Sequence, residues 1–481
     1  MTQMDVNGHM TNQFIFTEIT KANQFSSDGE SLYFWSGQYW QRVEKADERV
    51  LIRSCFTANT QAAISTGRIK EIIALIKECP ELQMKMADMD TGIIQFQNGT
   101  FHVTQQILQE KQNKEKEKVA VVKANYIPQT KIEDSQCFLE FCKSSLDYNG
   151  NPEKTKLLLQ IIGYSLSGYR KAKKAFFLIG APSSGKSVLL HWIKEVMPKE
   201  DITQIPFGNL GNRFCLGQLR NARLNICAEL AENCFPDIQT FKEIVSGDDL
   251  SGENKGEDMF KFKPQVTLLN AGNVLALPKN ADGTLSVVDR MVLLLFNHSV
   301  PQEQWDTELL EKLIDEKNII CSLAVDTLKE LVNSNFQFTN PDDSRVYLSN
   351  YRDAMDSVNT FVREECQLGE DYTVLSVELW NKYKNYCTDN MFQISISQQV
   401  FVNKIVNMSG VEKERRRIDG RQQTIFRGIK YGKMEKKERK EDEIFEPRLG
   451  SGGQSVMTEK HLAHPVRKPV VFQSNSGRTV K

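Results

Sequence analysis

The stretch from Ala175 to Leu190 constrains the fold of this chain more than any other. It begins with a run of apolar residues, Ala175 to Ile179, which is long enough for one buried β-strand. The sequence GAPSSGKS follows at residues 180–187 and matches the Gly-rich loop that binds phosphate groups. Apolar residues at helical spacing start at Val188. This order of strand, loop and helix predicts an α/β domain with a phosphate site at the end of one strand.

The residue types in this loop suit the binding of ATP with Mg²⁺. Gly180 and Gly185 let the backbone approach phosphate oxygens, and the N–H groups of the loop and the first helical turn then face the phosphate. Lys186 offers a positive charge to the β- and γ-phosphates, and the Ser187 hydroxyl is a ligand for Mg²⁺. A chance match in a Gly/Ser turn is the alternative, which the flanking strand and helix argue against. The predicted nucleotide-binding residues are Gly180, Ala181, Pro182, Ser183, Ser184, Gly185, Lys186 and Ser187.

The size and composition of the chain fit a globular protein of two or three domains. It has 481 residues, of which 40% are hydrophobic and 26% charged. We expect a cytoplasmic protein without a membrane segment, because residues 1–14 lack an apolar core and no apolar run is long enough to span a bilayer. Ten cysteines without a C-x-x-C pair indicate free thiols. The net charge of −1 argues against a uniformly basic coat protein, although a local basic channel remains compatible with it.

An acidic residue follows the next apolar strand of the α/β region. Residues 224–229 read LNICAE and end at Glu229, and Glu232 lies three residues further on. A carboxylate at the tip of a strand beside the phosphate loop can hold the water shell of Mg²⁺, or it can polarise the attacking water. The alternative is a pair of surface glutamates at a strand end. Both glutamates are predicted catalytic residues, and the sequence leaves open which of them activates water.

Two further polar residues flank the later strands. Asn273 follows the apolar strand at residues 266–270, where an amide side chain can sense a γ-phosphate or position water. Arg290 precedes the apolar strand at residues 291–296 and is placed to reach the nucleotide of a neighbouring subunit. The alternatives are an Asn-capped turn and an ion-paired surface arginine.

A lysine-rich segment separates the acidic residue from the sensor strand. Residues 241–264 predict a helix, a Gly-Asp turn and a hairpin, with Lys255 near the hairpin tip. Lysines on such a tip can follow a phosphate backbone, which makes Lys255 a predicted DNA-binding residue. The alternative is an ordinary solvated loop.

The remaining chain divides by composition and periodicity. Residues 346–431 show three helices and a closing strand, which is typical of a winged-helix module. The last part of this module is rich in arginine, with Arg415, Arg416, Arg417, Arg421 and Arg427 close together. Residues 432–481 are charged and then rich in Gly, Ser and Pro, which predicts a disordered tail. The other predicted parts are an N-terminal α+β module at 1–130, a helical segment at 131–172 and an α/β ATPase domain at 173–335.

Taken together, these motifs resemble a known family. Their order resembles a superfamily 3 helicase and, more narrowly, the phage/plasmid primase–helicase C-terminal family, which is related to poxvirus-type nucleoside triphosphatases. The resemblance covers most of residues 30–431, and no segment resembles the primase or zinc domains of that family. The segments that carry it are GAPSSGKS, LNICAE, FKEIVSGDDLSG, LLNAGN and DRMVLLLF.

The resemblance implies a fold and a set of partners. It implies an AAA+-like P-loop ATPase core, preceded by an α+β and helical domain and followed by a winged helix. It also implies a homo-oligomeric ring, expected to be a hexamer, that hydrolyses ATP to unwind DNA. The DNA would belong to a phage, plasmid or integrated element in the cytoplasm of a bacterium. Single- and double-stranded DNA, a primase and other replication proteins are the implied partners.

The resemblance also implies roles for single residues. Lys186 and Ser187 take the nucleotide and Mg²⁺, Glu229 takes the Walker B role, Asn273 the sensor role and Arg290 the arginine-finger role, and Lys255 takes the DNA-contacting role. This chain departs from the pattern at Asp289, where many relatives have a second arginine. Two alternatives stay open: a DNA-binding replication initiator whose ATP site is an assembly switch, and an unrelated phosphate-loop enzyme such as a small-molecule kinase.

Overall fold

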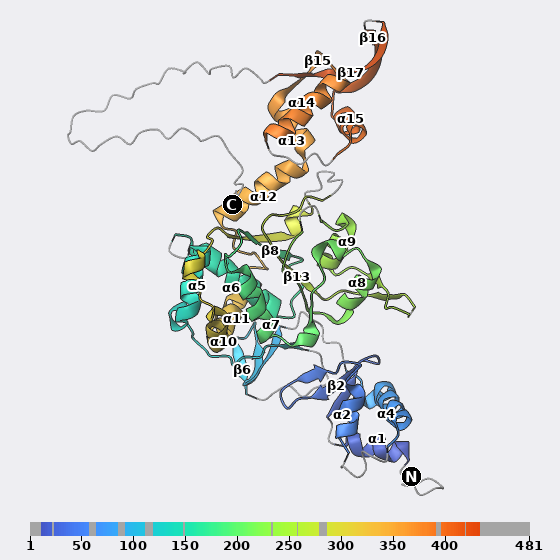
Figure 1. The fold of residues 1–481 in the computed structure, drawn as a ribbon, viewed down its shortest axis with the longest axis vertical. Coiled ribbons are helices and arrows are strands. Elements are labelled where there is room, and N and C mark those ends of the chain that lie inside the picture. The colour runs from blue at the N-terminus through green and yellow to red at the C-terminus, as the bar shows by residue number, and fades with distance from the viewer. Residues whose placement is uncertain are drawn as a thin grey trace, which may run out of the picture. The chain divides into compact units, whose positions relative to one another are not determined.

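The computed structural model describes most of the chain between residues 11 and 432. The described residues fall into two compact units, the first reaching to Val346 and the second starting at Tyr347 (Figure 1). No helix among the described residues is both long enough and apolar enough to cross a membrane. The described ranges are 11–21, 24–56, 64–84, 92–110, 119–147, 150–231, 234–256, 258–278, 286–390, 396–418 and 420–432.

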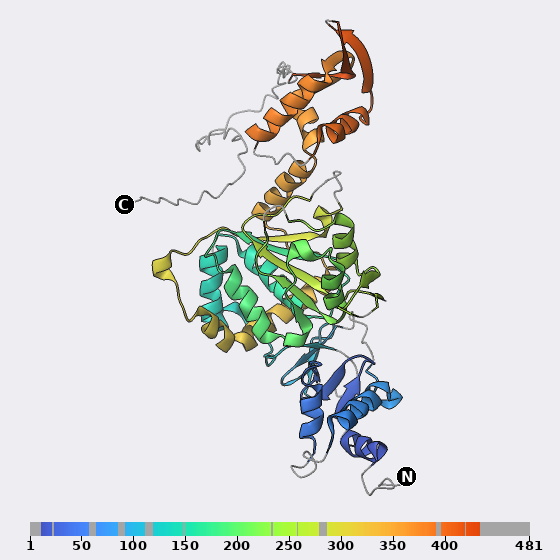
Figure 2. The ribbon, with the colours of Figure 1, turned by 45° about the vertical axis from the view of Figure 1, so that its right-hand side comes forward.

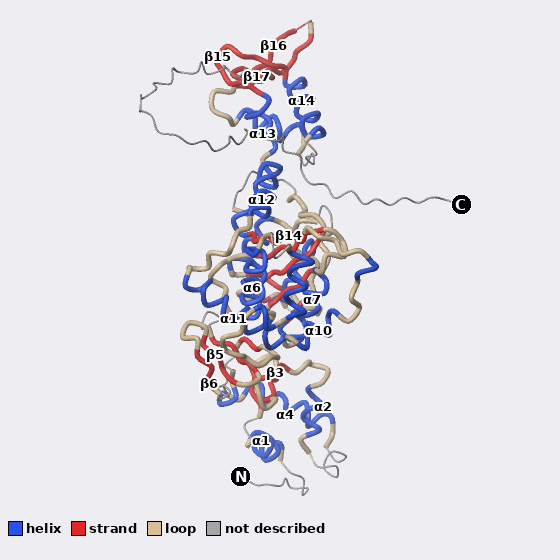
Figure 3. Tube along the Cα trace, turned by 90° about the vertical axis from the view of Figure 1, so that its left-hand side faces the viewer, coloured by secondary structure: helices blue, strands red, loops and turns tan. Residues whose placement is uncertain are grey.

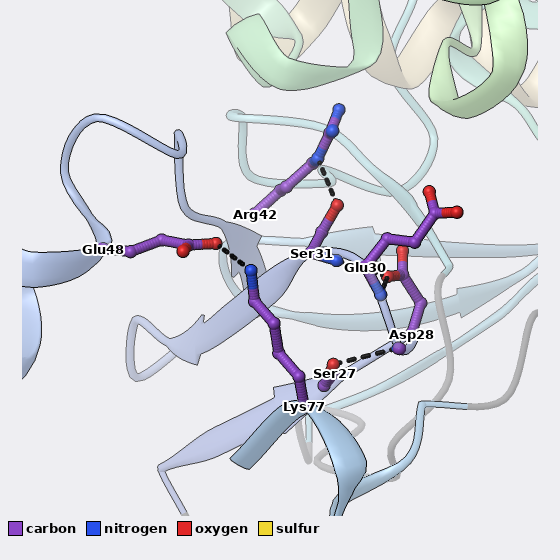
Figure 4. Close-up of polar contacts among 8 residues, drawn as sticks. Ser27, Asp28, Glu30, Ser31, Arg42, Glu48 and Lys77 are labelled. Atoms are coloured by element: carbon purple, nitrogen blue, oxygen red, sulfur yellow. Dashed lines mark hydrogen bonds and ion pairs between the residues drawn. The ribbon is translucent and has the colours of Figure 1, made fainter. Parts of the chain in front are cut away.

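The first unit begins with a small α+β module that has its own apolar core. A three-stranded antiparallel sheet in the order β1-β2-β3 packs with the helices. Figure 4 shows two of its polar contacts: Lys77 pairs with Glu48 at 2.7 Å, and Arg42 Nε donates to Ser31 Oγ at 3.0 Å. The elements are α1 (Asn12–Thr20), β1 (Phe25–Ser27), β2 (Leu32–Trp35), β3 (Trp40–Arg42), α2 (Glu48–Ser54) and α4 (Thr66–Glu78).

A second small sheet follows, in the order β6-β5-β4-β7. Asn98-Gly99 lies at the turn of a hairpin in this sheet, since Phe96 pairs with Gly99 across it. The buried residues of this sheet belong to the same apolar core as the central sheet, so packing groups the sheet with the central domain. Its strands are β4 (Ile93–Phe96), β5 (Gly99–His102), β6 (Ile107–Gln109) and β7 (Ala120–Val121).

The central domain is built on a five-stranded parallel sheet in the order β14-β8-β13-β10-β9. Helices lie on both faces of this sheet (Figure 2). Every residue of β8, β10, β13 and β14 is buried, which explains why these strands read as continuous apolar runs. The strands are β8 (Ala175–Gly180), β9 (Ile202–Thr203), β10 (Leu224–Cys227), β13 (Thr267–Gly272) and β14 (Met291–Phe296).

The helices and one short hairpin complete the central domain. The helices α6 and α11 pack closely on each other, and Gly163 of α6 allows this because a Cβ atom there would collide with the backbone of Ala324. The elements are α5 (Gln136–Leu146), α6 (Pro152–Leu166), α7 (Lys186–Val196), α8 (Arg213–Gln218), α9 (Ile238–Ser246), β11 (Leu250–Gly252), β12 (Phe260–Phe262), α10 (Leu309–Asp315) and α11 (Lys317–Asn333).

The second unit combines helices with a three-stranded antiparallel sheet in the order β15-β17-β16 (Figure 3). The chain breaks at Asp356 between two helices, which adds one helix to the three that the sequence predicted in this part of the chain. The sequence did not predict β15, whose register shifts between Leu368 and Thr373 around the polar segment Gly-Glu-Asp. The elements are α12 (Asp342–Met355), α13 (Ser357–Glu365), β15 (Cys366–Leu375), α14 (Ser376–Asp389), α15 (Gln398–Val406), β16 (Glu412–Ile418) and β17 (Arg421–Tyr431).

Candidate functional site

The GAPSSGKS loop connects the end of β8 to the start of α7, and its two glycines are required by the packing around it. A Cβ atom on Gly180 would collide with the carbonyl oxygen of Phe296 on the neighbouring strand. Gly185 has φ +92°, and a Cβ atom there would lie 2.6 Å from Cε2 of Phe141. The backbone therefore takes a path that only glycine allows at both ends of the loop.

Lys186 is folded into the loop that precedes it. Its ammonium group donates to the carbonyl oxygens of Gly180 at 2.8 Å and Ala181 at 2.7 Å, and it lies 3.0 Å from Ser184 Oγ. Burial lowers the pKa of Lys186 to about 8. Most of the population therefore carries the charge at neutral pH, and an anion that enters the loop meets a cation already in place.

The start of α7 fits a phosphate group. The N-cap residue Gly185 has no side chain to cap the helix, so the N–H groups of the first turn keep their capacity to donate to a ligand. Ser187, in that turn, is exposed, while Ser184 is buried and Pro182 and Ser183 form the exposed rim of the loop. These features suit the phosphates of ATP, with the Ser187 hydroxyl available to Mg²⁺.

The segment that follows β14 is hydrogen-bonded to the backbone of the GAPSSGKS loop. Ser299 Oγ donates to the carbonyl oxygen of Pro182 at 2.8 Å, and the Val300 N–H donates to that of Ser183 at 3.0 Å. No sequence motif indicates this contact, because residues 297–300 follow a strand far along the chain and match no known pattern.

The parallel sheet brings two of the other predicted residues to the edge that carries the loop. β8, β13 and β10 are neighbours and run in the same direction, so their carboxyl ends lie at one edge. Glu229 comes two residues after β10 and Asn273 directly after β13, and both side chains are exposed. The Leu230 N–H donates to the Ala271 carbonyl oxygen at 2.7 Å, which keeps the chain around Glu229 beside β13. Glu232 lies outside the described residues.

The sensor strand contains two asparagines in different environments. Asn270 is fully buried, and its amide nitrogen donates to the Phe176 carbonyl oxygen at 3.2 Å. Asn273 stands beyond the last residue of the strand and is exposed. The exposed side chain is the one that a ligand at this edge can contact.

Arg290 lies at the opposite edge of the sheet. It ends a 3₁₀ turn (Val288–Arg290) directly before β14, and Met291 pairs with Ala175 at the start of β8. Six strand residues separate that edge from the loop, a distance of about 20 Å at ~3.3 Å per residue. The guanidinium group donates to Ser246 Oγ at 3.2 and 3.4 Å and to the Ser286 carbonyl oxygen at 2.8 Å. Arg290 is therefore out of reach of the loop in its own subunit.

The predicted hairpin is confirmed and carries Lys255 in its exposed connection. β11 and β12 pair antiparallel, with Gly252 opposite Phe260. Lys261 is exposed whereas Phe262 is buried, as the alternation along the strand predicted. The hairpin starts near the edge that carries Arg290, because α9, which contains Ser246, leads into it.

The helix α8 is fixed to this hairpin by backbone contact and by charge. Arg213 Nε lies 2.9 Å from a Glu253 carboxylate oxygen. In the 3₁₀ turn that follows α8 (Leu219–Asn221), the Arg220 guanidinium carbon lies 4.7 Å from the centre of the Phe260 ring. Gly217 and Gly252 touch so closely that a Cβ atom on Gly252 would lie 2.8 Å from the Cα atom of Gly217. The two segments therefore behave as one rigid piece.

Gly217→Ala should loosen the hairpin. A methyl group at Gly217 would lie 2.9 Å from the Glu253 carbonyl oxygen, and this overpacking should outweigh the ~1 kcal/mol that alanine gains in helix propensity. We expect the amides of β11 to exchange hydrogen at least ~10-fold faster. The matched control is Gly211→Ala, which adds its methyl group where no atom lies within 4 Å. Equal exchange in both variants would mean that the contact does not hold the hairpin.

Phe214, which sequence reasoning missed, presents an exposed aromatic ring on α8. Its side chain is 42% exposed, and the Arg213 guanidinium carbon lies 5.3 Å from the ring centre. An exposed aromatic ring next to basic residues is a surface on which a nucleic-acid base can stack. Nothing in the sequence around Phe214 indicates its exposure, which depends on how α8 packs on the hairpin.

Two protein-family profiles match separate parts of the chain. Residues 12–145 match a family described as D5 N terminal like, and residues 178–290 match a family of unknown function, DUF5906. The second match runs from within β8 to Arg290 and therefore contains every residue predicted for the nucleotide and DNA sites. Each match covers less than a third of the chain.

The chain is also similar to solved structures of the NrS-1 C-terminal region, at low identity. An apo structure of that region is 11% identical with a TM-score of 0.45 and covers 88% of this chain and 100% of its own. Its A form apo structure is 10% identical with a TM-score of 0.44 and covers 86% of this chain and 98% of its own. No curated protein matches the chain.

Proposed function

We propose that this protein is an ATP-dependent, ring-forming replicative DNA helicase of a phage, plasmid or integrated mobile element. One observation carries the proposal. The loop, Glu229 and Asn273 occupy one edge of the parallel sheet, and Arg290 occupies the other. A subunit with a nucleotide site on one side and an arginine on the other suits head-to-tail assembly, in which each interface combines both. The match of residues 12–145 to the D5 N terminal like family supports a role in replication.

The proposed chemistry is hydrolysis of ATP at the interface between subunits. Lys186 leaves the loop carbonyls and neutralises the charge on the β- and γ-phosphates. Ser187 and Glu229 would hold Mg²⁺, which offsets the charge of the phosphates. Glu229 or Glu232 orients the attacking water, Asn273 contacts the γ-phosphate, and Arg290 of the next subunit stabilises the transition state.

The proposed DNA contact is the surface formed by the hairpin and α8. Lys255 offers a charge to the phosphate backbone, and Phe214 offers a ring for base stacking. In a ring of subunits, which the family resemblance implies to be a hexamer, these residues would line a central channel around one strand. The winged-helix-like second unit would contact duplex DNA, and a primase or other replication proteins would act on the same DNA.

Lys255→Ala should uncouple ATP hydrolysis from DNA. Lys255 is exposed in a hairpin that starts at the far edge from the loop, so basal hydrolysis should persist while DNA stimulation and unwinding fall. The slope of log affinity against log salt for single-stranded DNA should decrease by roughly 0.7 per subunit contact. Lys263→Ala, an exposed lysine just after β12, is the control. If the variant unwinds DNA at the normal rate and its DNA affinity has the normal salt dependence, Lys255 is an ordinary solvent-exposed lysine that does not contact DNA.

A strand-displacement assay with forked DNA, ATP and Mg²⁺ tests the proposal. We expect ATP-dependent unwinding together with ATP-dependent oligomers. Oligomers and DNA binding without unwinding would favour the replication initiator whose ATP site is an assembly switch. Nucleotide hydrolysis or transfer that is indifferent to DNA would favour a small-molecule kinase or another phosphate-loop enzyme.

A further inference from the structure

The two strands β16 and β17 form a hairpin whose faces differ in charge. Their register is antiparallel over seven pairs, from Glu412 with Arg427 to Ile418 with Arg421. Residues paired across such a ladder point to the same side, and neighbours along one strand point to opposite sides. The register therefore assigns every side chain of the hairpin to one of two faces.

One face carries a row of three basic residues, Lys413, Arg415 and Arg417, which we call the basic row. All three are exposed, and among the described residues no carboxylate lies within 4.0 Å of any of them. The residues opposite them on β17 are uncharged: Phe426, Thr424 and Gln422. The basic row is therefore a positive strip without internal compensation.

The other face contains both signs of charge. Arg416 lies 3.4 Å from Glu414 on the same strand, and Arg427 stands opposite Glu412 in the register. By formal charge this face has three arginines, Arg416, Arg421 and Arg427, and two glutamates, Glu412 and Glu414, which sum to +1 against +3 on the basic row. A polyanion that approaches the hairpin meets much stronger attraction on the first face.

The basic row is also held in a fixed shape. At ~3.4 Å per residue its three side chains extend over about 14 Å. The row starts beside Phe426, which is fully buried in the core of the second unit, and β17 continues there as the central strand of the sheet. A rigid row loses less conformational entropy on binding a fixed array of charges than a flexible loop does.

The chemistry of this face favours duplex over single-stranded nucleic acid. Proteins that bind single strands add aromatic platforms for base stacking, and the only aromatic residue among the paired residues of this face, Phe426, is buried. Gln422 and Thr424 add hydrogen-bond donors for phosphate oxygens instead. The face offers charge and hydrogen bonds in a line, as needed for the backbone of a double helix.

We propose that the basic row of Lys413, Arg415 and Arg417 is the surface with which the second unit grips the phosphate backbone of duplex DNA, independently of base sequence. The proposal rests on the proposed function, which it deepens by assigning duplex contact to one face of one hairpin. The opposite face, with Arg416 and Arg427, does not take part.

A pair of double variants of the full chain tests the proposal. Arg415→Gln with Arg417→Gln removes two charges from the basic row, and Arg416→Gln with Arg427→Gln removes two from the other face. Binding to a blunt duplex is titrated without nucleotide at several salt concentrations. The first variant should lose at least ~10-fold in affinity near 0.1 M salt, with a slope of log affinity against log salt smaller by about 1.8. The second should keep the slope and bind within ~3-fold of the unchanged protein.

The possible outcomes separate the basic row from the helicase activity. Equal losses in both variants would show that only net charge matters, and unchanged binding in both would show that the hairpin is not in contact, so either result would overturn the proposal. A larger loss for a single strand of the same length than for the duplex would also overturn it. If the unchanged protein fails to unwind DNA but the first variant alone loses duplex affinity, the helicase proposal fails and the basic row stands.

Discussion

Lys186→Ala should lower the rate of ATP hydrolysis at least ~100-fold. The ammonium group is the one cation that the structure places inside the GAPSSGKS loop, where burial already lowers its pKa to about 8. Removing a preorganised charge that stabilises the transition state typically costs 10²–10³-fold in rate, or about 3–4 kcal/mol. Steady-state phosphate release with saturating ATP and Mg²⁺ measures the effect.

Folding should survive this substitution, because the loop lies at the edge of the sheet and its strand and helix are held by the apolar core. The control is Lys194→Ala on the same helix, roughly two turns away from the loop, which should hydrolyse ATP at the normal rate. An unfolding temperature within a few degrees of that of the unchanged protein would establish that activity is lost because the charge is missing and not because the protein is unfolded. Hydrolysis within a few-fold of normal would remove the basis for the nucleotide site.

Arg290→Ala should lower hydrolysis by on the order of 10³-fold in the assembled protein, the lower end of the range for an arginine finger. Its own loop lies about 20 Å away along the strands, so Arg290 cannot touch a nucleotide in its own subunit, and we expect it to act on the nucleotide of a neighbouring subunit. Ser246→Ala is the matched control: it removes the hydroxyl group that holds Arg290 within its own subunit and should leave most of the activity. Full activity of Arg290→Ala would make the arginine an ordinary surface residue.

A mixture of the Lys186→Ala and Arg290→Ala proteins separates action between subunits from action within one. In a random ring, about a quarter of the interfaces combine an intact Lys186 with an intact Arg290 from the next subunit. The mixture should therefore recover up to roughly a quarter of the normal rate, whereas neither protein alone recovers any. A sedimentation measurement that finds only monomers with ATP and DNA would exclude the ring itself.

Much of the central domain could be predicted because its signals are local. The run from Ala175 to Ile179 is apolar throughout since both faces of β8 are covered, and the glycines of the loop are needed for the backbone path itself. The hairpin at Asn98-Gly99 is likewise fixed by its turn residues. In such segments the neighbours in sequence already determine the conformation.

What could not be predicted depends on contacts between distant segments. β15 has a polar centre and becomes a strand only because β17 pairs with both of its ends. The exposure of Phe214 results from the contact of α8 with the hairpin, and the grouping of the sheet β4–β7 with the central core results from packing across the domain. The side of the sheet on which Arg290 lies also follows from strand direction, which no local pattern records.

Because Ser299 and Val300 contact the loop, β14 connects the edge of the sheet that carries Arg290 to the edge that carries the loop. The strand begins directly after Arg290 and ends just before the segment that is hydrogen-bonded to Pro182 and Ser183. The strand β14 is paired along its whole length with β8 and therefore joins the Arg290 end of the sheet to the segment that contacts the loop. If the subunits assemble as proposed, β14 would connect the nucleotide site of each subunit to the arginine that this subunit offers to its neighbour.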